Sequence, residues 1–116
     1  METHRLVITE DLNQYGKLFG GRLLSWIDEA SFIAATLDFP DCQFVTIGMD
    51  KVEFNHGVQN GAILVIRSTH THTGKTSVRY KVEVFRGRCD SNNVIFETNV
   101  TFVNVNTDGN KTAINA

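Results

Sequence analysis

The stretch GRLLSWIDEASFIAATLD, residues 21–38, decides the fold, because its apolar residues recur at steps of three and four. Phe32 and Ile33 extend the apolar surface almost all the way round the predicted helix. A helix this apolar is enclosed by other elements rather than laid on a surface. Pro40 disfavours helix at Phe39 and ends it. The residues of the apolar stripe are Leu23, Ile27, Ala30, Ala34 and Leu37, with Leu24, Ser31 and Ala35 beside them.

After this helix the sequence changes to a period of two, the repeat of a β-strand. Alternation is clearest over residues 75–88, and similar segments are predicted at 43–54, 62–73 and 93–106, with a short first strand at 3–9. The connections are short and rich in turn residues, which favours antiparallel pairing. The prediction is an α+β fold: an antiparallel sheet of five or six strands wrapped around one central helix, with residues 1–116 as a single domain.

Composition argues against several classes of protein. The formal net charge of −2 over 116 residues provides no basic surface for nucleic acid. The longest apolar runs are far shorter than the ~20 residues of a membrane span, and residues 1–10 are too polar for a signal peptide. Cys42 and Cys89 are expected as free thiols in a reducing compartment, which favours a cytoplasmic protein.

Three motifs follow one another along the chain. The first is a glycine-rich loop with an acid on the helix after it: Asn13, Gly16, Phe19, Gly20, Gly21 and Asp28. The second is TGKTSVRYKVEVF, residues 73–85, and the third is TFVNVNTDGNKTAI, residues 101–114. In this order they resemble the hotdog-fold acyl-CoA thioesterases, specifically the YciA-like branch. The sequence departs from that family after Phe54, where a proline-valine pair and then Gly-Asp are usual; here Gly57-Val58 and Gly61-Ala62 stand there, with His56 beside them.

The resemblance implies a hotdog fold and the hydrolysis of an acyl-CoA thioester to free acid and coenzyme A, without a further cofactor. It also implies that sheet edges pair across a homodimer, and that such dimers assemble as trimers of dimers. The turn after residue 73 is expected to contact the pantetheine or the phosphates of coenzyme A through Gly74, Lys75, Thr76 and Ser77. Charge for the phosphates is available from Lys75, Arg79, Arg86, Arg88 and Lys111.

Asp28 is the main catalytic candidate. The alternative to a catalytic role is that its carboxylate simply reaches solvent from the helix or pairs with Arg22. Against this, it lies on or beside the apolar stripe, and an unpaired carboxylate there is costly unless chemistry or a partner requires it. As a general base it would activate water, and as a nucleophile it would attack the carbonyl directly. Glu29 is a weaker second candidate, since it points about 100° away on the helix.

Gly20 and Gly21 at the helix start would offer backbone N–H groups to the thioester oxygen, because the first amides of a helix lack partners. Asn13 is either a turn asparagine or, as the resemblance implies, a catalytic residue that orients the water or the carbonyl and faces the aspartate of a partner subunit. His70 and His72 are predicted to share one strand face, but two ligands do not make a metal site, and none is predicted.

Two other functions compete with thioester hydrolysis. A non-catalytic acyl-CoA-binding hotdog domain, acting as a sensor, would keep the pocket without needing Asp28. A dehydratase of the same fold would be expected to use a histidine beside the helix, and the segment before the helix has none after His4. The sequence does not fix the acyl chain length, which depends on the directions of Trp26, Phe32 and Phe39.

Overall fold

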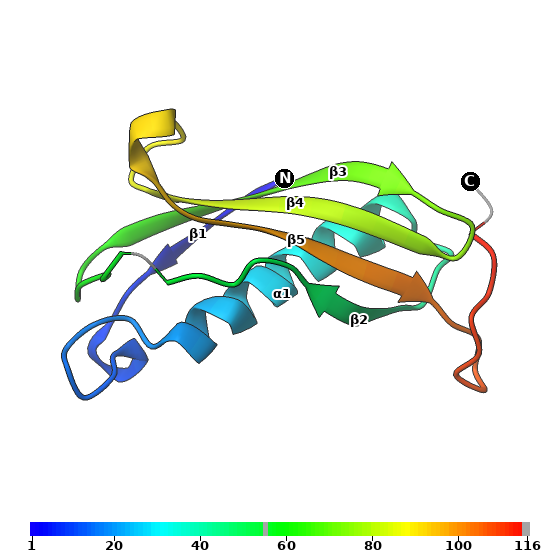
Figure 1. The fold of residues 1–116 in the computed structure, drawn as a ribbon, viewed down its shortest axis with the longest axis horizontal. Helices are drawn as coiled ribbons and strands as arrows, with labels where there is room; N and C mark the ends of the chain where they lie inside the picture. Colours follow the sequence, from blue (N-terminus) through cyan, green and yellow to red (C-terminus); the bar gives the residue numbers. More distant parts are fainter. Residues whose placement is uncertain (55, 115–116) are drawn as a thin grey trace.

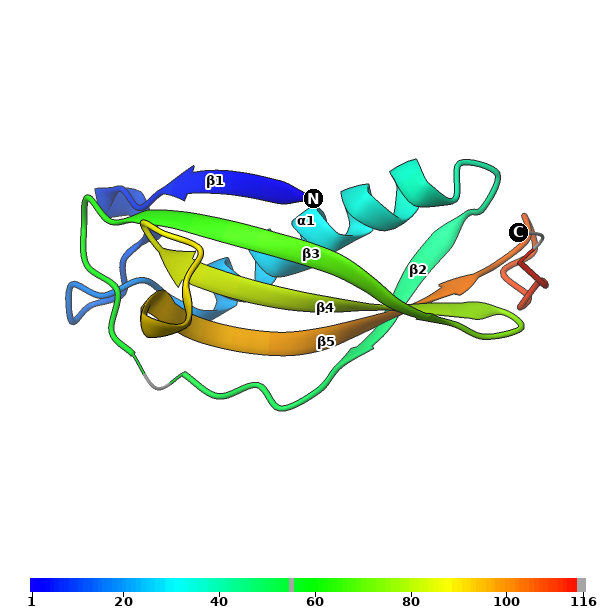
Figure 2. The same cartoon turned by 90° about the horizontal axis from the view of Figure 1, so that it is seen from above.

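The computed structural model describes residues 1–54 and 56–114, without the side chain of Ser91. Five strands form one antiparallel sheet in the order β1-β3-β4-β5-β2, and a single long helix lies against one face of it (Figures 1 and 2). The α+β architecture predicted from the sequence is therefore confirmed. The elements are β1 (Glu2–Leu6), α1 (Gly20–Asp38), β2 (Phe44–Met49), β3 (Ile63–Thr73), β4 (Ser77–Arg86) and β5 (Val94–Asn104), with short 3-10 helices at Thr9–Asp11 and Ser91–Asn93.

Helix α1 begins one residue before the predicted start and ends where Pro40 requires. Its apolar stripe packs on the sheet, with Ile27 and Ala35 fully buried and Trp26 nearly so. However, the sheet of one chain covers only part of the helix, and Phe32 and Leu37 remain 40% and 68% exposed. The enclosure predicted for the helix is therefore incomplete within a single chain.

The core lies between α1 and the inner face of the three central strands. Val78, Tyr80, Val82 and Val84 of β4 are all fully buried, as the alternation predicted. The ring of Phe102 on β5 packs edge-on to the buried ring of Tyr80 and to the partly exposed ring of Phe32, and aromatic pairs of this kind add to the stability that apolar burial provides. This layer of side chains fixes the face of the sheet on which α1 lies.

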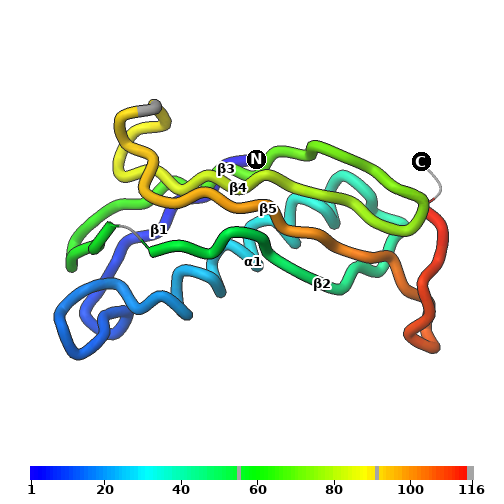
Figure 3. The backbone as a smooth tube through the Cα atoms, in the orientation of Figure 1, coloured from blue at the N-terminus to red at the C-terminus, as the bar shows by residue number. Residues whose placement is uncertain are grey.

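Strand β2 is shorter than predicted. It was expected over residues 43–54 but ends at Met49, because the side chain of Asp50 takes the next position beside β5. Asp50 accepts hydrogen bonds from the Asn99 amide at 2.9 Å and from Arg79 at 2.8 Å, and Lys51 then turns into the left-handed region with φ 46°. The segment after it runs along the edge of the sheet toward the start of α1 (Figure 3).

A β-bulge in β3 contradicts the prediction that His70 and His72 share one face. The register pairs His70 with Tyr80, whose side chain is buried, and His72 with Arg79, whose side chain is exposed. Directly paired residues of an antiparallel sheet project to the same face, so the extra residue Thr71 places the two imidazoles on opposite faces.

Strands β1 and β2 form the two edges of the sheet. The outer edge of β2 carries Val45 and Ile47, and both side chains are exposed. An apolar edge of this kind is available for pairing with another chain. No helix within residues 1–54 and 56–114 is long and apolar enough to cross a membrane.

Candidate active site

The loop before α1 is folded around the side chain of Asn13. Its Oδ1 atom accepts hydrogen bonds from the backbone amides of Tyr15 at 2.9 Å and Lys17 at 3.2 Å. Gly16 has φ 77°, a conformation that favours glycine, which explains its place in the motif. The side-chain oxygen of Asn13 thus acts as that of an ordinary turn asparagine, which was the simpler of the two interpretations. Its side-chain nitrogen makes no hydrogen bond to the described residues.

The first two amides of α1 are available to a ligand. Arg22 and Leu23 donate their amides to the Phe19 carbonyl, whereas those of Gly20 and Gly21 find no acceptor within residues 1–54 and 56–114. No side chain caps this helix end. Because the N-terminus of a helix also carries positive partial charge, these amides suit an oxygen that becomes negative.

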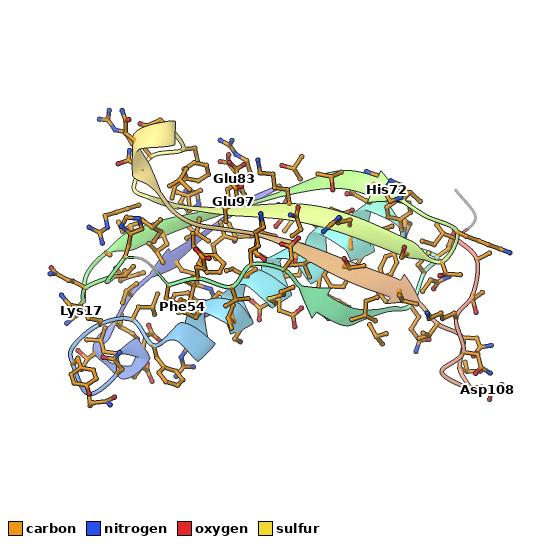
Figure 4. All side chains as sticks on the ribbon, viewed as in Figure 1. Lys17, Phe54, His72, Glu83, Glu97 and Asp108 are labelled. Atoms are coloured by element: carbon orange, nitrogen blue, oxygen red, sulfur yellow. The ribbon has the colours of Figure 1, made fainter. Side chains whose placement is uncertain are left out.

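A cavity of about 310 Å³ opens beside these amides. Its walls combine apolar side chains with a few polar groups: Asn13, Lys17, Leu18, Gly20, Leu23, Phe54, His56, Gly57 and Val58. Lys17 and Phe54 lie at the end of the molecule where α1 begins (Figure 4). A Cβ atom on Gly20 would lie only 3.0 Å from the Phe54 ring, so a larger residue there would make the ring shift by a few tenths of an ångström.

Asp28 lies between α1 and the edge strand β2. Its Oδ1 atom accepts a hydrogen bond from the hydroxyl of Thr46 at 2.7 Å. The expected alternative pair with Arg22 does not form, because Arg22 lies 3.4 Å from Asp11 instead. Glu29 pairs with Arg5 at 2.7 Å on the β1 side, as its predicted direction implied. Asp28 is half-buried and has no cationic partner within the described part of the chain.

Within one chain, Asp28 does not meet the other predicted catalytic residues. Eight residues of helix separate it from Gly20, which corresponds to about 12 Å along the axis. It is also absent from the walls of the cavity that Asn13 and Gly20 line. A single chain therefore brings Asn13 and Gly20 to one cavity and leaves the carboxylate at a different place.

The predicted coenzyme A turn lies toward the far end of α1, a helix about 27 Å long from Gly20 to Asp38 (Figure 2). There the ring of Phe39, just after the helix, contacts His70 at 5.6 Å, and the Lys75 carbonyl accepts the Ile114 amide at 2.8 Å. His72, near this turn, lies at the opposite end of the molecule from Lys17 in Figure 4. The structure of one chain thus separates Gly74, Lys75, Thr76 and Ser77 from the cavity at the helix start.

Sequence reasoning missed two residues beside the site, Thr46 and Phe54. Thr46 faces Asp28 because it pairs with Phe102 just before a bulge in β2, and the glycine within that strand, Gly48, is the sequence signal that could have marked the bulge. It also missed the hydroxyl of Tyr80, which donates to Asp38 at 2.5 Å. Burial, with Asp38 adding to it, raises the pKa of Tyr80 well above its usual range.

Cys42 and Cys89 are free thiols, as predicted, and burial raises the pKa of Cys42. Among the residues that the structure describes, no three side chains of the metal-binding types come together. Of the basic residues considered for phosphates, Arg79 is held by Asp50 and Arg86 donates to the Gly57 carbonyl at 3.1 Å.

Comparison with known proteins places this geometry in a family. The model of the Thioesterase superfamily matches residues 15–91. A hexameric hotdog fold thioesterase of Campylobacter jejuni superposes with a TM-score of 0.83 and 37% sequence identity, covering 97% of this chain and 88% of that one. An acyl-CoA hydrolase of Staphylococcus aureus, solved with butyryl coenzyme A, gives a TM-score of 0.85 and 26% identity over 98% of this chain and 70% of that one.

A sequence relative is longer than this chain. Acyl-coenzyme A thioesterase 11 of Mus musculus is 27% identical over 84 residues, which is 72% of this chain but only 14% of the mouse protein. The five-stranded sheet curved over one long helix, the family match from Tyr15 to Ser91 and the likeness to the C. jejuni structure all agree: the chain has the hotdog fold and belongs to the Thioesterase superfamily.

Proposed function

We propose that this protein is an acyl-CoA thioesterase of the YciA-like branch, which hydrolyses acyl-CoA to a free acid and coenzyme A. One observation carries the proposal: the unpartnered amides of Gly20 and Gly21 stand at a helix N-terminus, and Asn13 and Gly20 line the cavity there. The names of the relatives support it, since the S. aureus and mouse proteins are an acyl-CoA hydrolase and an acyl-CoA thioesterase.

In the proposed reaction the thioester oxygen accepts hydrogen bonds from the Gly20 and Gly21 amides. Asp28, acting as general base, takes a proton from water, and the resulting hydroxide attacks the carbonyl carbon. The negative charge that develops on the oxygen is stabilised by the amides, each of which is worth about 2.7–4 kcal/mol in comparable sites. Collapse of the tetrahedral intermediate breaks the carbon–sulfur bond, and the thiolate of coenzyme A receives the proton that Asp28 took. Direct attack by the carboxylate is the alternative route.

The carboxylate of this site comes from a second copy of the chain. The distance of about 12 Å along α1 between Gly20 and Asp28 supports this proposal, as does the absence of Asp28 from the walls of the cavity that Asn13 lines. The S. aureus hydrolase provides support: structures exist of its variants with an asparagine and an aspartate each replaced by alanine, and those two residues are fifteen positions apart, as Asn13 and Asp28 are.

We infer a homodimer formed through the edge of β2, where Val45 and Ile47 are exposed beside the bare side of α1. Pairing there would cover the edge and bring a second sheet toward Phe32. Three such dimers would make a hexamer, the state of the C. jejuni thioesterase. The turn Gly74–Ser77 would then reach coenzyme A from a subunit other than the one that supplies Asn13.

Three further features belong to the proposal. Residues 1–116 act as a single hotdog domain, and the reaction needs no cofactor besides the coenzyme A of the substrate. A cytoplasmic location fits the two free thiols, which a reducing compartment maintains.

The decisive experiment measures free thiol released from a panel of acyl-CoAs of increasing chain length. Wild type should turn over at least one, and Asp28→Ala should lose activity by about 10²–10⁴-fold. Glu29→Ala is the matched control: it removes the neighbouring carboxylate and an exposed ion pair worth at most about 1 kcal/mol, and should retain activity. Binding of acyl-CoA without turnover at any length would contradict the proposal and favour the non-catalytic sensor.

A further inference from the structure

Three cavities meet at His56, a residue that the proposed mechanism does not use. The first is the cavity of about 310 Å³ at the start of α1. The second, of about 290 Å³, is bordered by Glu53 and Glu97, and the third, of about 380 Å³, by Arg86. Small-molecule sites are typically ~300–1,000 Å³, so a ligand larger than one cavity would extend from the first into one of the others.

The second and third cavities, into which such a ligand would extend from the first, differ in charge. Besides His56, the second cavity has one cation and two carboxylates on its walls, namely Lys51, Glu53 and Glu97. The third has no carboxylate among its lining residues and offers Arg86 with the side-chain amides of Asn92 and Asn93. The nearest acid that contacts these amides is Asp90, which accepts a hydrogen bond from Asn93 at 3.0 Å. The third cavity, with its donors and no carboxylate on its walls, therefore suits phosphate groups better than the second.

Two basic side chains flank Gly57, on the rim between the first and third cavities. The stem of Lys17 packs over Gly57, with Cδ 3.3 Å from where a Cβ would stand, and its ammonium group has no carboxylate partner among the described residues. From the other side, Arg86 uses Nη2 to hold the Gly57 carbonyl at 3.1 Å. The remaining N–H groups of that guanidinium have no acceptor in the described chain, and guanidinium N–H groups bind phosphate oxygens well.

From this arrangement we infer that the phosphate-bearing end of the coenzyme A thioester passes His56 and occupies the third cavity, where His56 and Arg86 donate to its phosphates and Lys17 adds positive charge from the rim of the first cavity. The inference rests on the proposed function and adds to it the direction in which coenzyme A extends from the catalytic cavity. The acyl thioester stays in the first cavity, whose apolar walls include Leu23 and Phe54. The carboxylate-lined second cavity stays empty of ligand.

The test compares two substrates of one acyl group: the acyl-CoA, and the S-acyl pantetheine that lacks all phosphates. Arg86→Gln and Lys17→Met remove charge but keep most of the side-chain volume, and His56→Ala removes the imidazole. We expect Arg86→Gln to raise KM for acyl-CoA about tenfold, with smaller increases for the other two, and kcat unchanged. The kinetic constants of Arg86→Gln for acyl pantetheine should be those of wild type, because Arg86 does not line the first cavity. Lys81→Met is the control, because that residue lies on the outer face of the sheet, 3.8 Å from Glu97.

Two results would overturn the inference while leaving thioester hydrolysis intact. One is an equal rise of KM for both substrates, which would mean that the variants disturb the catalytic cavity. The other is a rise of KM for acyl-CoA in Lys75→Ala alone, which would assign the phosphates to the turn at the other end of α1. If wild type hydrolyses neither substrate, the proposed function fails, and calorimetry with 3′,5′-ADP decides the phosphate site separately: binding that Arg86→Gln weakens supports it, and no binding refutes it.

Discussion

Mixing two inactive variants tests whether Asn13 and Asp28 act across a subunit boundary. In one chain Asn13 lines the cavity at the start of α1, whereas Asp28 lies about 12 Å further along the helix and is held by Thr46 of β2. Neither side chain is long enough to close that distance. If the proposed chemistry is right, each complete site takes these residues from two chains.

The expected activity follows from the two-fold symmetry of a dimer. Equal co-expression of Asn13→Ala and Asp28→Ala chains makes about half of the dimers heterodimers. Each heterodimer has one site with both substitutions and one site with neither, so about one quarter of all sites are intact. Equal co-expression of wild type with a chain that carries both substitutions also leaves about one quarter intact, all of them in wild-type homodimers.

The assay is thiol release per protomer, with the ratio of the two chains checked by mass spectrometry. Each single variant alone should retain at most about 1% of wild-type activity if its residue acts in catalysis. Both mixtures should then recover about one quarter. Residues that act within one chain would give the opposite pattern, with no recovery in the first mixture and about one half in the second, and that result would refute the shared site.

Three further perturbations have defined outcomes. Gly20→Ala keeps both amides but places a methyl group 3.0 Å from the Phe54 ring at the wall of the first cavity, so kcat/KM should fall by up to about 10²-fold with the circular dichroism spectrum unchanged; wild-type kinetics would contradict a role for this wall in positioning the thioester. Ile47→Lys adds a charge to the open edge of β2 and should yield monomers in light scattering, and an unaltered oligomer would place the interface elsewhere. Tyr80→Phe should reduce the fall of the free energy of unfolding with pH under alkaline conditions. Burial and the bond to Asp38 raise the pKa of Tyr80, so the folded chain keeps a proton that the unfolded chain loses above pH ~10. This contribution is complete below that pH and declines by up to about 1.4 kcal/mol per pH unit above it, which denaturant titrations of both proteins would measure; parallel curves would contradict it.

Local sequence patterns predicted those parts of the fold in which the repeat is uninterrupted. Val78 to Val84 alternate without a bulge, so counting in twos identified every buried residue of that run. The helix was nearly as clear: the sequence predicted it from Gly21 to the residues before Pro40, and its observed start at Gly20 is one residue earlier. In contrast, the end of β2 depends on Asp50 contacting Asn99 and Arg79, which are distant in sequence, and on a left-handed backbone at Lys51. Neither the contacts of Asp50 nor the backbone conformation of Lys51 produces a periodic pattern in the sequence.

The residues of the site also fall into those that local sequence patterns predicted and those that they did not. Asn13 and the glycine pair lie within one loop and one helix turn, so their motif predicted that they come together. Thr46 and Phe54 were missed, because each reaches the site through strand register and loop path rather than through sequence neighbours. The position of Asp28 relative to Asn13 depends on how two chains meet, which no pattern in a single chain contains.

The extra residue Thr71 reverses which side chains of β3 face the helix. Before it, even-numbered residues such as His70 face the helix; after it the parity reverses, so Thr73 faces inward and bonds His70 at 2.7 Å while His72 faces outward. Gain or loss of a single codon here would therefore exchange the inner and outer surfaces of the strand end that leads into the 74–77 turn. In comparisons among homologues, a one-residue gap at this point means a different surface, even where every flanking amino acid is the same.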